Sequence, residues 1–125
     1  MSEFCMVLST APSCQAAEEI AREIVSGELA ACVQIVPLHR SVYRWKGQLC
    51  SDEEALMLIK TTTAAYAQLE AAIRGLHSYE VPEIVRLDLS GGSQPYLEWL
   101  RESVRAPDGG SAPGSPETRP LPRER

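Results

Sequence analysis

The stretch that decides the fold is ACVQIVPLHRSVYRWKGQLCSDEEALMLIKTT, residues 31–62. Five of its first six residues are apolar and three of them are β-branched, which is typical of a strand. The side chains of residues 40–46 would alternate between the two sides of a strand. Gly47 can take the positive φ of a tight turn, after which residues 48–62 would form a second strand that runs back along the first. The pattern predicts one long, bent β-hairpin, with Pro37 at an edge or a bulge because proline has no N–H for the ladder.

The predicted hairpin is too long for a small domain. A strand from Cys32 to Trp45 would be about 46 Å long, whereas a domain of 100 residues is only about 34 Å across. A protruding tip would expose apolar side chains, namely Val42, Tyr43, Trp45 and Leu49. Soluble proteins cover such surfaces, so we expect a partner subunit. The alternative is that Pro37 bends the strand back and Trp45 covers the core of its own chain.

On the N-terminal side of the hairpin, residues 4–10 form a short apolar run typical of a buried strand. Apolar residues then recur at helical spacing from an N-cap at Ser13 to a stop at Gly27. This order predicts a buried strand followed by an amphipathic helix.

On the C-terminal side, residues 64–77 predict a second helix. Val85 and Leu87 alternate with polar residues in a strand that we expect to bury one face. The Gly91-Gly92-Ser93 turn leads into a third helix. The order β-α-β-β-α-β plus a C-terminal helix predicts an α+β, ferredoxin-like domain in which two helices cover one face of an antiparallel sheet.

The last 19 residues have a different composition. Residues 107–125 hold five of the nine prolines, three of the eight glycines, and equal numbers of acids and bases. Such a segment cannot bury enough apolar surface to offset its ordering entropy. We therefore expect a folded domain over residues 1–106 and a disordered tail over residues 107–125. Its Pro-x-Pro stretch, residues 120–122, would suit a protein partner that recognises polyproline.

Charge and cysteine usage narrow the function classes. The whole net charge of −5 falls on residues 1–106, which argues against nucleic acid and anionic membranes as partners. Residues 1–10 lack a basic segment, and no run approaches the roughly 18 apolar residues of a spanning helix. The four cysteines form no C-x-x-C pair, which favours free thiols in a reducing compartment. These features predict a cytoplasmic protein.

Six short motifs occur in a fixed order along the chain. They are STAP at 9–12, LAACV at 29–33, SVYRWKG at 41–47, IKT at 59–61, H-x-Y-E-V-P-E at 77–83 and Y-L-x-W at 96–99. Together they resemble the CutA family of divalent-cation tolerance proteins. The resemblance implies a tight homotrimer in which the long hairpins pair between subunits. It also implies an architecture similar to that of the PII signal proteins. It also implies a role in tolerance to copper and other divalent cations, no required cofactor, and no enzymatic activity.

The densest group of ligand-capable side chains is His77, Tyr79, Glu80 and Glu83. Imidazole and carboxylate suit copper, zinc and similar ions. We predict Glu83 and His77 as metal ligands. The alternative for His77 is a structural role, because the helix dipole favours a histidine at a helix C-terminus. The family resemblance would add a thiol in the first strand, where this chain has Ser9, and a hydroxyl is a poor copper ligand.

A second predicted site combines Trp45, Lys60, Tyr79 and Glu83, with Tyr43 beside them, near a cleft between subunits that the resemblance implies. An aromatic wall with a cation and a carboxylate could hold a small polar ligand. Alternatively, Lys60 and Glu83 pair across the interface and fix the trimer.

Three functions remain open at this point. The first is a divalent-cation tolerance protein that binds copper or a similar ion weakly, the second is a PII-like sensor of a small ligand, and the third is a structural trimer used as a scaffold.

Overall fold

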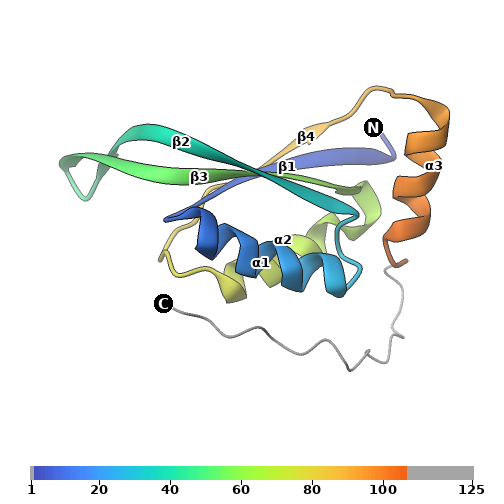
Figure 1. Cartoon of the computed structure of the whole chain (residues 1–125), viewed down its shortest axis with the longest axis horizontal. Helices are drawn as coiled ribbons and strands as arrows, with labels where there is room; N and C mark the ends of the chain where they lie inside the picture. The colour runs from blue at the N-terminus through green and yellow to red at the C-terminus, as the bar shows by residue number, and fades with distance from the viewer. Residues whose placement is uncertain (1, 107–125) are drawn as a thin grey trace.

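A computed structural model describes residues 2–106. Residue 1 and the predicted tail, residues 107–125, lie outside the described residues. The elements are β1 (Phe4–Ala11), α1 (Cys14–Ser26), β2 (Cys32–Trp45), β3 (Gln48–Thr62), the short 3-10 helix η1 (Thr63–Ala65), α2 (Tyr66–Leu76), β4 (Ile84–Asp88) and α3 (Gln94–Ser103). Figure 1 shows the α+β arrangement that the sequence predicts.

The helix ends follow the predicted capping residues. Ser13 caps α1, and its Oγ accepts a hydrogen bond of 3.0 Å from the Ala16 N–H. Gly27 ends the same helix. Ser93 caps α3, with Pro95 in the first turn, where a missing N–H costs nothing.

The four strands form one antiparallel sheet in the order β2-β3-β1-β4. β2 and β3 make the predicted hairpin, and Lys46 and Gly47 form its turn with φ of 53° and 80°. Pro37 lies on an edge strand, as expected, but the register shifts between Leu38 and Ser41 instead of at the proline. In Figure 1 the outer part of the hairpin extends well beyond the helices.

One face of the sheet carries the core. α1 and α2 lie side by side against it (Figure 1), and their apolar residues pack on Val7, Met57 and Ile59, all 0% exposed. A smaller cluster joins Phe4 to Leu100 of α3. Because alternate residues of a strand face opposite sides, the neighbours of these buried residues point away from the helices.

The opposite face, which we call the open face, corrects one expectation. Val85 and Leu87 were expected to be buried, yet they are 48% and 42% exposed. They pair with Leu8 and Met6 of β1, whose side chains alternate with the buried Val7. The reason is that the helices cover only one side of the sheet, so an apolar stripe on the other side has no cover within residues 2–106.

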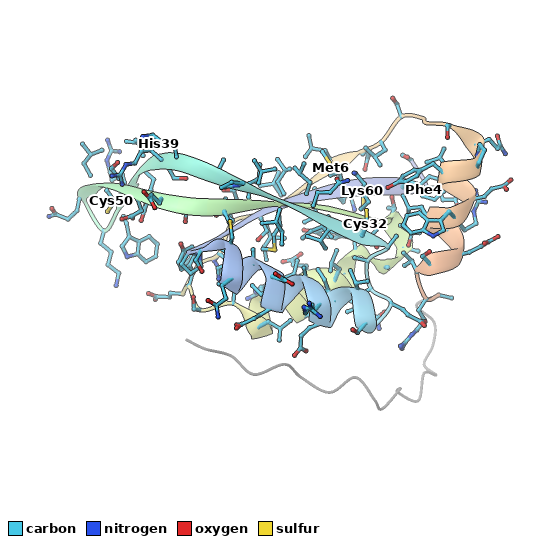
Figure 2. The ribbon with its side chains drawn as sticks, in the orientation of Figure 1. Phe4, Met6, Cys32, His39, Cys50 and Lys60 are labelled. Atoms are coloured by element: carbon cyan, nitrogen blue, oxygen red, sulfur yellow. The ribbon has the colours of Figure 1, made fainter. Side chains whose placement is uncertain are left out.

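Figure 2 shows the two ends of the hairpin: His39 and Cys50 lie toward its outer end, whereas Cys32 and Lys60 lie at its inner end, near Met6 of β1. The alternative that Trp45 covers the core is wrong, since Trp45 belongs to neither core cluster and is 40% exposed. Among residues 2–106 there is no helix that is long and apolar enough to cross a membrane.

Candidate functional site

His77 fixes the loop that follows α2. Its Nδ1 accepts a hydrogen bond of 3.1 Å from the Tyr79 N–H, and its Nε2 lies 2.6 Å from the carbonyl oxygen of Thr10. Because a neutral imidazole has one donor and one acceptor nitrogen, Nε2 carries the proton and donates to Thr10. His77 thus ties residues 77–79 to the end of β1, and both of its ring nitrogens are in use.

Two tyrosine–carboxylate pairs brace the hairpin. The Tyr79 hydroxyl donates to Glu54 Oε2 at 2.6 Å, and the Tyr43 hydroxyl donates to Asp52 Oδ2 at 2.5 Å. Burial and then the Glu54 carboxylate raise the pKa of Tyr79 well above its usual range. The hydrogen bond to Asp52 raises the pKa of Tyr43 to about 12. These two hydrogen bonds hold the Tyr43 and Tyr79 rings in place.

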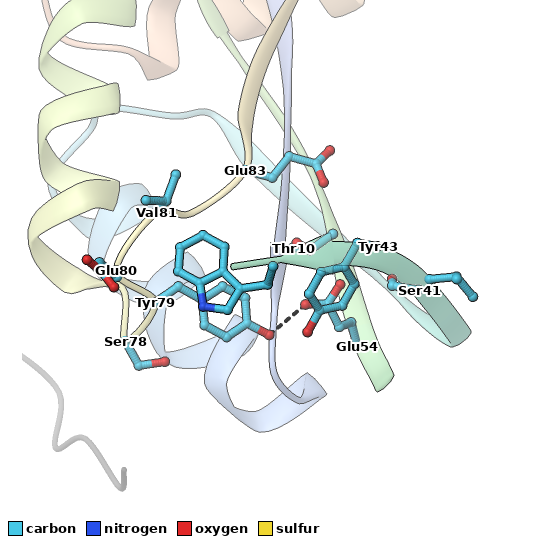
Figure 3. A pocket seen from close by; sticks show the side chains of 11 residues that line it. Thr10, Ser41, Tyr43, Glu54, Ser78, Tyr79, Glu80, Val81 and Glu83 are labelled. Atoms are coloured by element: carbon cyan, nitrogen blue, oxygen red, sulfur yellow. Dashed lines mark hydrogen bonds between the residues drawn. The ribbon is translucent and has the colours of Figure 1, made fainter. Parts of the chain in front are cut away.

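A cavity of about 670 Å³ lies between the hairpin and the loop after α2. We call it the hairpin cavity, and Figure 3 shows the side chains around it. It is lined by Thr10, Ser41, Val42, Tyr43, Trp45, Glu54, Ser78, Tyr79, Glu80, Val81 and Glu83. The charged members of this lining are all glutamates. The arrangement offers aromatic faces and negative charge together, which suits a positively charged ligand.

The structure brings most of the predicted cleft residues together. Tyr43, Trp45, Tyr79 and Glu83 all line the hairpin cavity. Lys60 is not among the lining residues, and its Nζ instead donates a 2.7 Å hydrogen bond to Gln34 Oε1. Lys60 pairs with Met6 and therefore lies on the open face of the sheet.

The two predicted metal ligands lie on the same loop. Glu83 lines the cavity, while His77 sits behind it with its ring centroid 4.7 Å from that of Tyr79. Among residues 2–106, no group of three or more histidine, cysteine, aspartate or glutamate side chains is arranged to hold a metal ion. Ser9, which stands where the resemblance would place a thiol, is 0% exposed, and its Oγ has no hydrogen-bond partner among the described residues.

Sequence reasoning missed Glu54, Ser41 and Thr10 as parts of the site. A signal for the hairpin residues was present, because a turn at residues 46–47 sets the cross-strand register. Ser41 lies on the same side of β2 as Tyr43, two residues away, and the register places it opposite Asp52, which binds Tyr43. The contact between Tyr79 and Glu54 joins residues 25 positions apart through the fold, so no local pattern indicates it.

A family model described as the CutA1 divalent ion tolerance protein matches residues 5–103. The "Divalent-cation tolerance protein CutA" of Thermus thermophilus is 49% identical over 99 residues, which cover 79% of this chain and 96% of that protein. The human "Protein CutA" is 43% identical over 93 residues, which cover 74% of this chain and 52% of that protein. This chain thus spans nearly all of the bacterial relative and about half of the human one.

Solved structures show the same similarity. A CutA1 structure from Thermus thermophilus superposes with a TM-score of 0.78 at 47% identity, covering 82% of this chain and 99% of that chain. The crystal structure of CutA1 from Oryza sativa gives a TM-score of 0.80 at 40% identity, covering 83% and 95%. The names of these proteins refer to CutA or cation tolerance and not to an enzyme. With the family model and these relatives matching across the folded residues, the chain belongs to the CutA1 divalent ion tolerance family.

Proposed function

We propose that the chain is a homotrimeric divalent-cation tolerance protein without enzymatic activity, which binds copper or a similar ion weakly. The observation that carries this proposal is the family match over residues 5–103. The sheet order β2-β3-β1-β4, with two helices on one face, supports the ferredoxin-like assignment.

The open face of the sheet supports the trimer. Val85 and Leu87, together with Met6 and Leu8 beside them, form an apolar stripe on β4 and β1. The hairpin tip exposes more apolar surface, with Val42 at 67% and Leu49 at 81%. Soluble proteins seldom leave such surfaces in water, so a second and third copy are the natural cover.

The assembly is tested by light scattering after size-exclusion chromatography. The full chain should run at about 41 kDa, three times its 13.7 kDa. A Val85→Lys, Leu87→Lys variant should run as a monomer, because two charges would be buried in the interface. Val25→Lys, at a similarly exposed valine of α1, should leave the trimer intact. A parent chain at 13.7 kDa would refute the assembly.

Metal binding rests on the acidic charge and on the loop that holds Glu83 and His77. Binding through His77 would have to displace the hydrogen bond to Tyr79 or the one to Thr10. That cost would make the affinity modest. The net charge of −5 per chain would gather cations around the trimer even without a specific site.

Calorimetric titration with copper and zinc separates the two effects. In high salt, diffuse attraction is screened, whereas a site with direct ligands persists. We expect Glu83→Gln and His77→Gln each to weaken copper binding in high salt, while Glu98→Gln, at an exposed glutamate of α3, does not. Identical isotherms for all four proteins would remove the assigned ligands from the proposal.

A reducing compartment such as the cytoplasm completes the proposal. It is supported by four free cysteines, of which Cys14 is exposed and Cys5 is buried. The names of the relatives give different cellular locations: an Arabidopsis thaliana relative is called chloroplastic, and a structure from Archaeoglobus fulgidus is called periplasmic.

A further inference from the structure

Lys60 places a positive charge on the open face of the sheet, among side chains of low polarity. It lies on β3 opposite Met6 of β1 and Cys32 of β2. Lys60 is half-buried within its own chain, and its Nζ donates a 2.7 Å hydrogen bond to the neutral amide of Gln34. An ammonium group has three N–H donors. In the described part of the chain, Lys60 takes part in no ion pair.

The open face also carries negative charge, but toward the outer end of the hairpin. Asp52 and Glu54 lie on the same side of β3 as Lys60, because each is an even number of residues away from it. Glu54 is six residues from Lys60, which is about 20 Å along a strand. Glu83 lines the hairpin cavity together with Glu54 (Figure 3). We call Asp52, Glu54 and Glu83 the acidic end of the open face.

The homotrimer proposed above covers the open face, and the inference below rests on that proposal. Covering the face takes water away from the ammonium group of Lys60. Burial of a charge is strongly unfavourable unless an opposite charge is brought to it. The copy that covers Lys60 must therefore supply a carboxylate. A copy that contacts it through the outer part of its own open face brings the acidic end.

A ring of three copies lets each chain use both of these regions. In such a ring the contacts are heterologous, which means that one patch of each copy meets a different patch of the next copy, and three identical contacts close the ring. Lys60 and the acidic end are two such patches with opposite charge. The outer part of the hairpin extends well beyond the helices (Figure 1), which leaves it free to lie across a neighbour.

We infer that, in the trimer, Lys60 of each copy forms an ion pair with the acidic end of the next copy, through Glu83 of the partner subunit. Asp52 and Glu54 already accept the hydroxyls of Tyr43 and Tyr79. The ion pair fixes how far one copy is shifted along the next, because other shifts leave the charges apart. A metal ion at Glu83 would compete with this ammonium group, which agrees with the weak binding proposed above.

Cross-linking tests the contact in the parent protein. A carbodiimide joins a lysine amine directly to a carboxylate, so it reports only pairs in contact. Trimers are refolded from an equal mixture of nitrogen-14 and nitrogen-15 chains, cross-linked and digested for mass spectrometry. We expect peptides that join Lys60 to the acidic end, including ones with one light and one heavy half. If Lys60 is joined to these carboxylates only within one chain, or not at all, the inference is overturned.

Charge reversal gives a second readout. Lys60→Glu and Glu83→Lys each bring like charges together, so the subunit concentration at half dissociation should rise at least about tenfold. It is measured by light scattering in a urea concentration that partly dissociates the parent. The double variant restores opposite charges and should recover most of the loss. Arg22→Glu, which breaks an ion pair with Glu18 on α1, is the control and should behave as the parent does.

The outcomes separate this inference from the proposed assembly. A parent chain that runs as a monomer would refute the trimer itself. A trimeric parent whose single variants dissociate as it does, or whose double variant is no more stable than the single ones, leaves the trimer standing and excludes the ion pair. Should Lys60→Glu fail to fold, the cross-link in the parent protein decides alone.

Discussion

The inner and outer halves of the hairpin have similar strand geometry but different surroundings. In β3, every second residue from Ala55 to Thr61 is buried, because α1 and α2 cover that face. In residues 48–53 of the same strand no residue is buried. Strand formation and burial are therefore separate outcomes: the turn and the pairing build the whole hairpin, while only the helices decide which half joins the core of the chain.

The largest effect should come from the inner half. Ile59→Ala removes a side chain that is 0% exposed and should lower the free energy of unfolding by about 2–5 kcal/mol, through lost burial and a cavity. Val42→Ala, at a side chain that is 67% exposed within its own chain but covered by another copy in the proposed trimer, should lower it by less than Ile59→Ala does. Urea unfolding of both variants measures the contrast. A change of less than about 0.5 kcal/mol at Val42 would show that no other copy covers the tip.

The next largest effect should come from the loop after α2, which lies beside the hairpin and which His77 ties to the end of β1. His77→Ala loses two hydrogen bonds to the backbone and should cost about 1–3 kcal/mol, because a donor and an acceptor are left without their partner. Urea unfolding gives this value. Tyr43→Phe in the outer half removes one exposed hydrogen bond and should cost less than His77→Ala; the reverse order would contradict the assignment of His77 as an anchor.

A smaller effect, of opposite sign, is expected within the buried face itself. Ser9→Ala should raise the stability by about 1 kcal/mol, because the buried Oγ of Ser9 has no hydrogen-bond partner within residues 2–106. Thr61→Val is the matched control, since Thr61 is equally buried but donates a 2.7 Å hydrogen bond to the Leu29 carbonyl. It should lower the stability by about 1 kcal/mol. Differential scanning calorimetry compares the two, and a loss at Ser9 would indicate a partner for its hydroxyl.

The smallest effect concerns pH and the outer half. The hydrogen bond to Asp52 raises the pKa of Tyr43 from 10.0 to about 12. Since the folded pKa lies above the unfolded one, this contact contributes fully below pH 10 and is lost as the pH rises through 12. Carbon-13 NMR of the tyrosine ring carbons follows the titration residue by residue. Asp52→Asn should bring the pKa of Tyr43 back toward 10, and an unchanged midpoint would exclude this pairing.

The local patterns predicted the elements well. Ser13, Gly27 and Ser93 act as the expected caps, and the β2–β3 turn falls at Lys46 and Gly47. Each of these features depends on neighbours within about five residues, where backbone and side-chain preferences dominate. For the same reason, the loop with Tyr79 and Glu83 could be singled out from its composition alone.

By itself, the sequence determined the order of strands and helices, the length of the hairpin and the acidic charge of the folded residues, since all three depend on spacing and composition along the chain. Only the tertiary structure decided that Val85 and Leu87 are exposed and that Glu54 joins Tyr79, while Lys60 lies apart from the cavity. The physical reason is that burial and long-range contacts depend on which elements pack together. An alternating strand looks the same whether its apolar face meets a helix, another subunit or water.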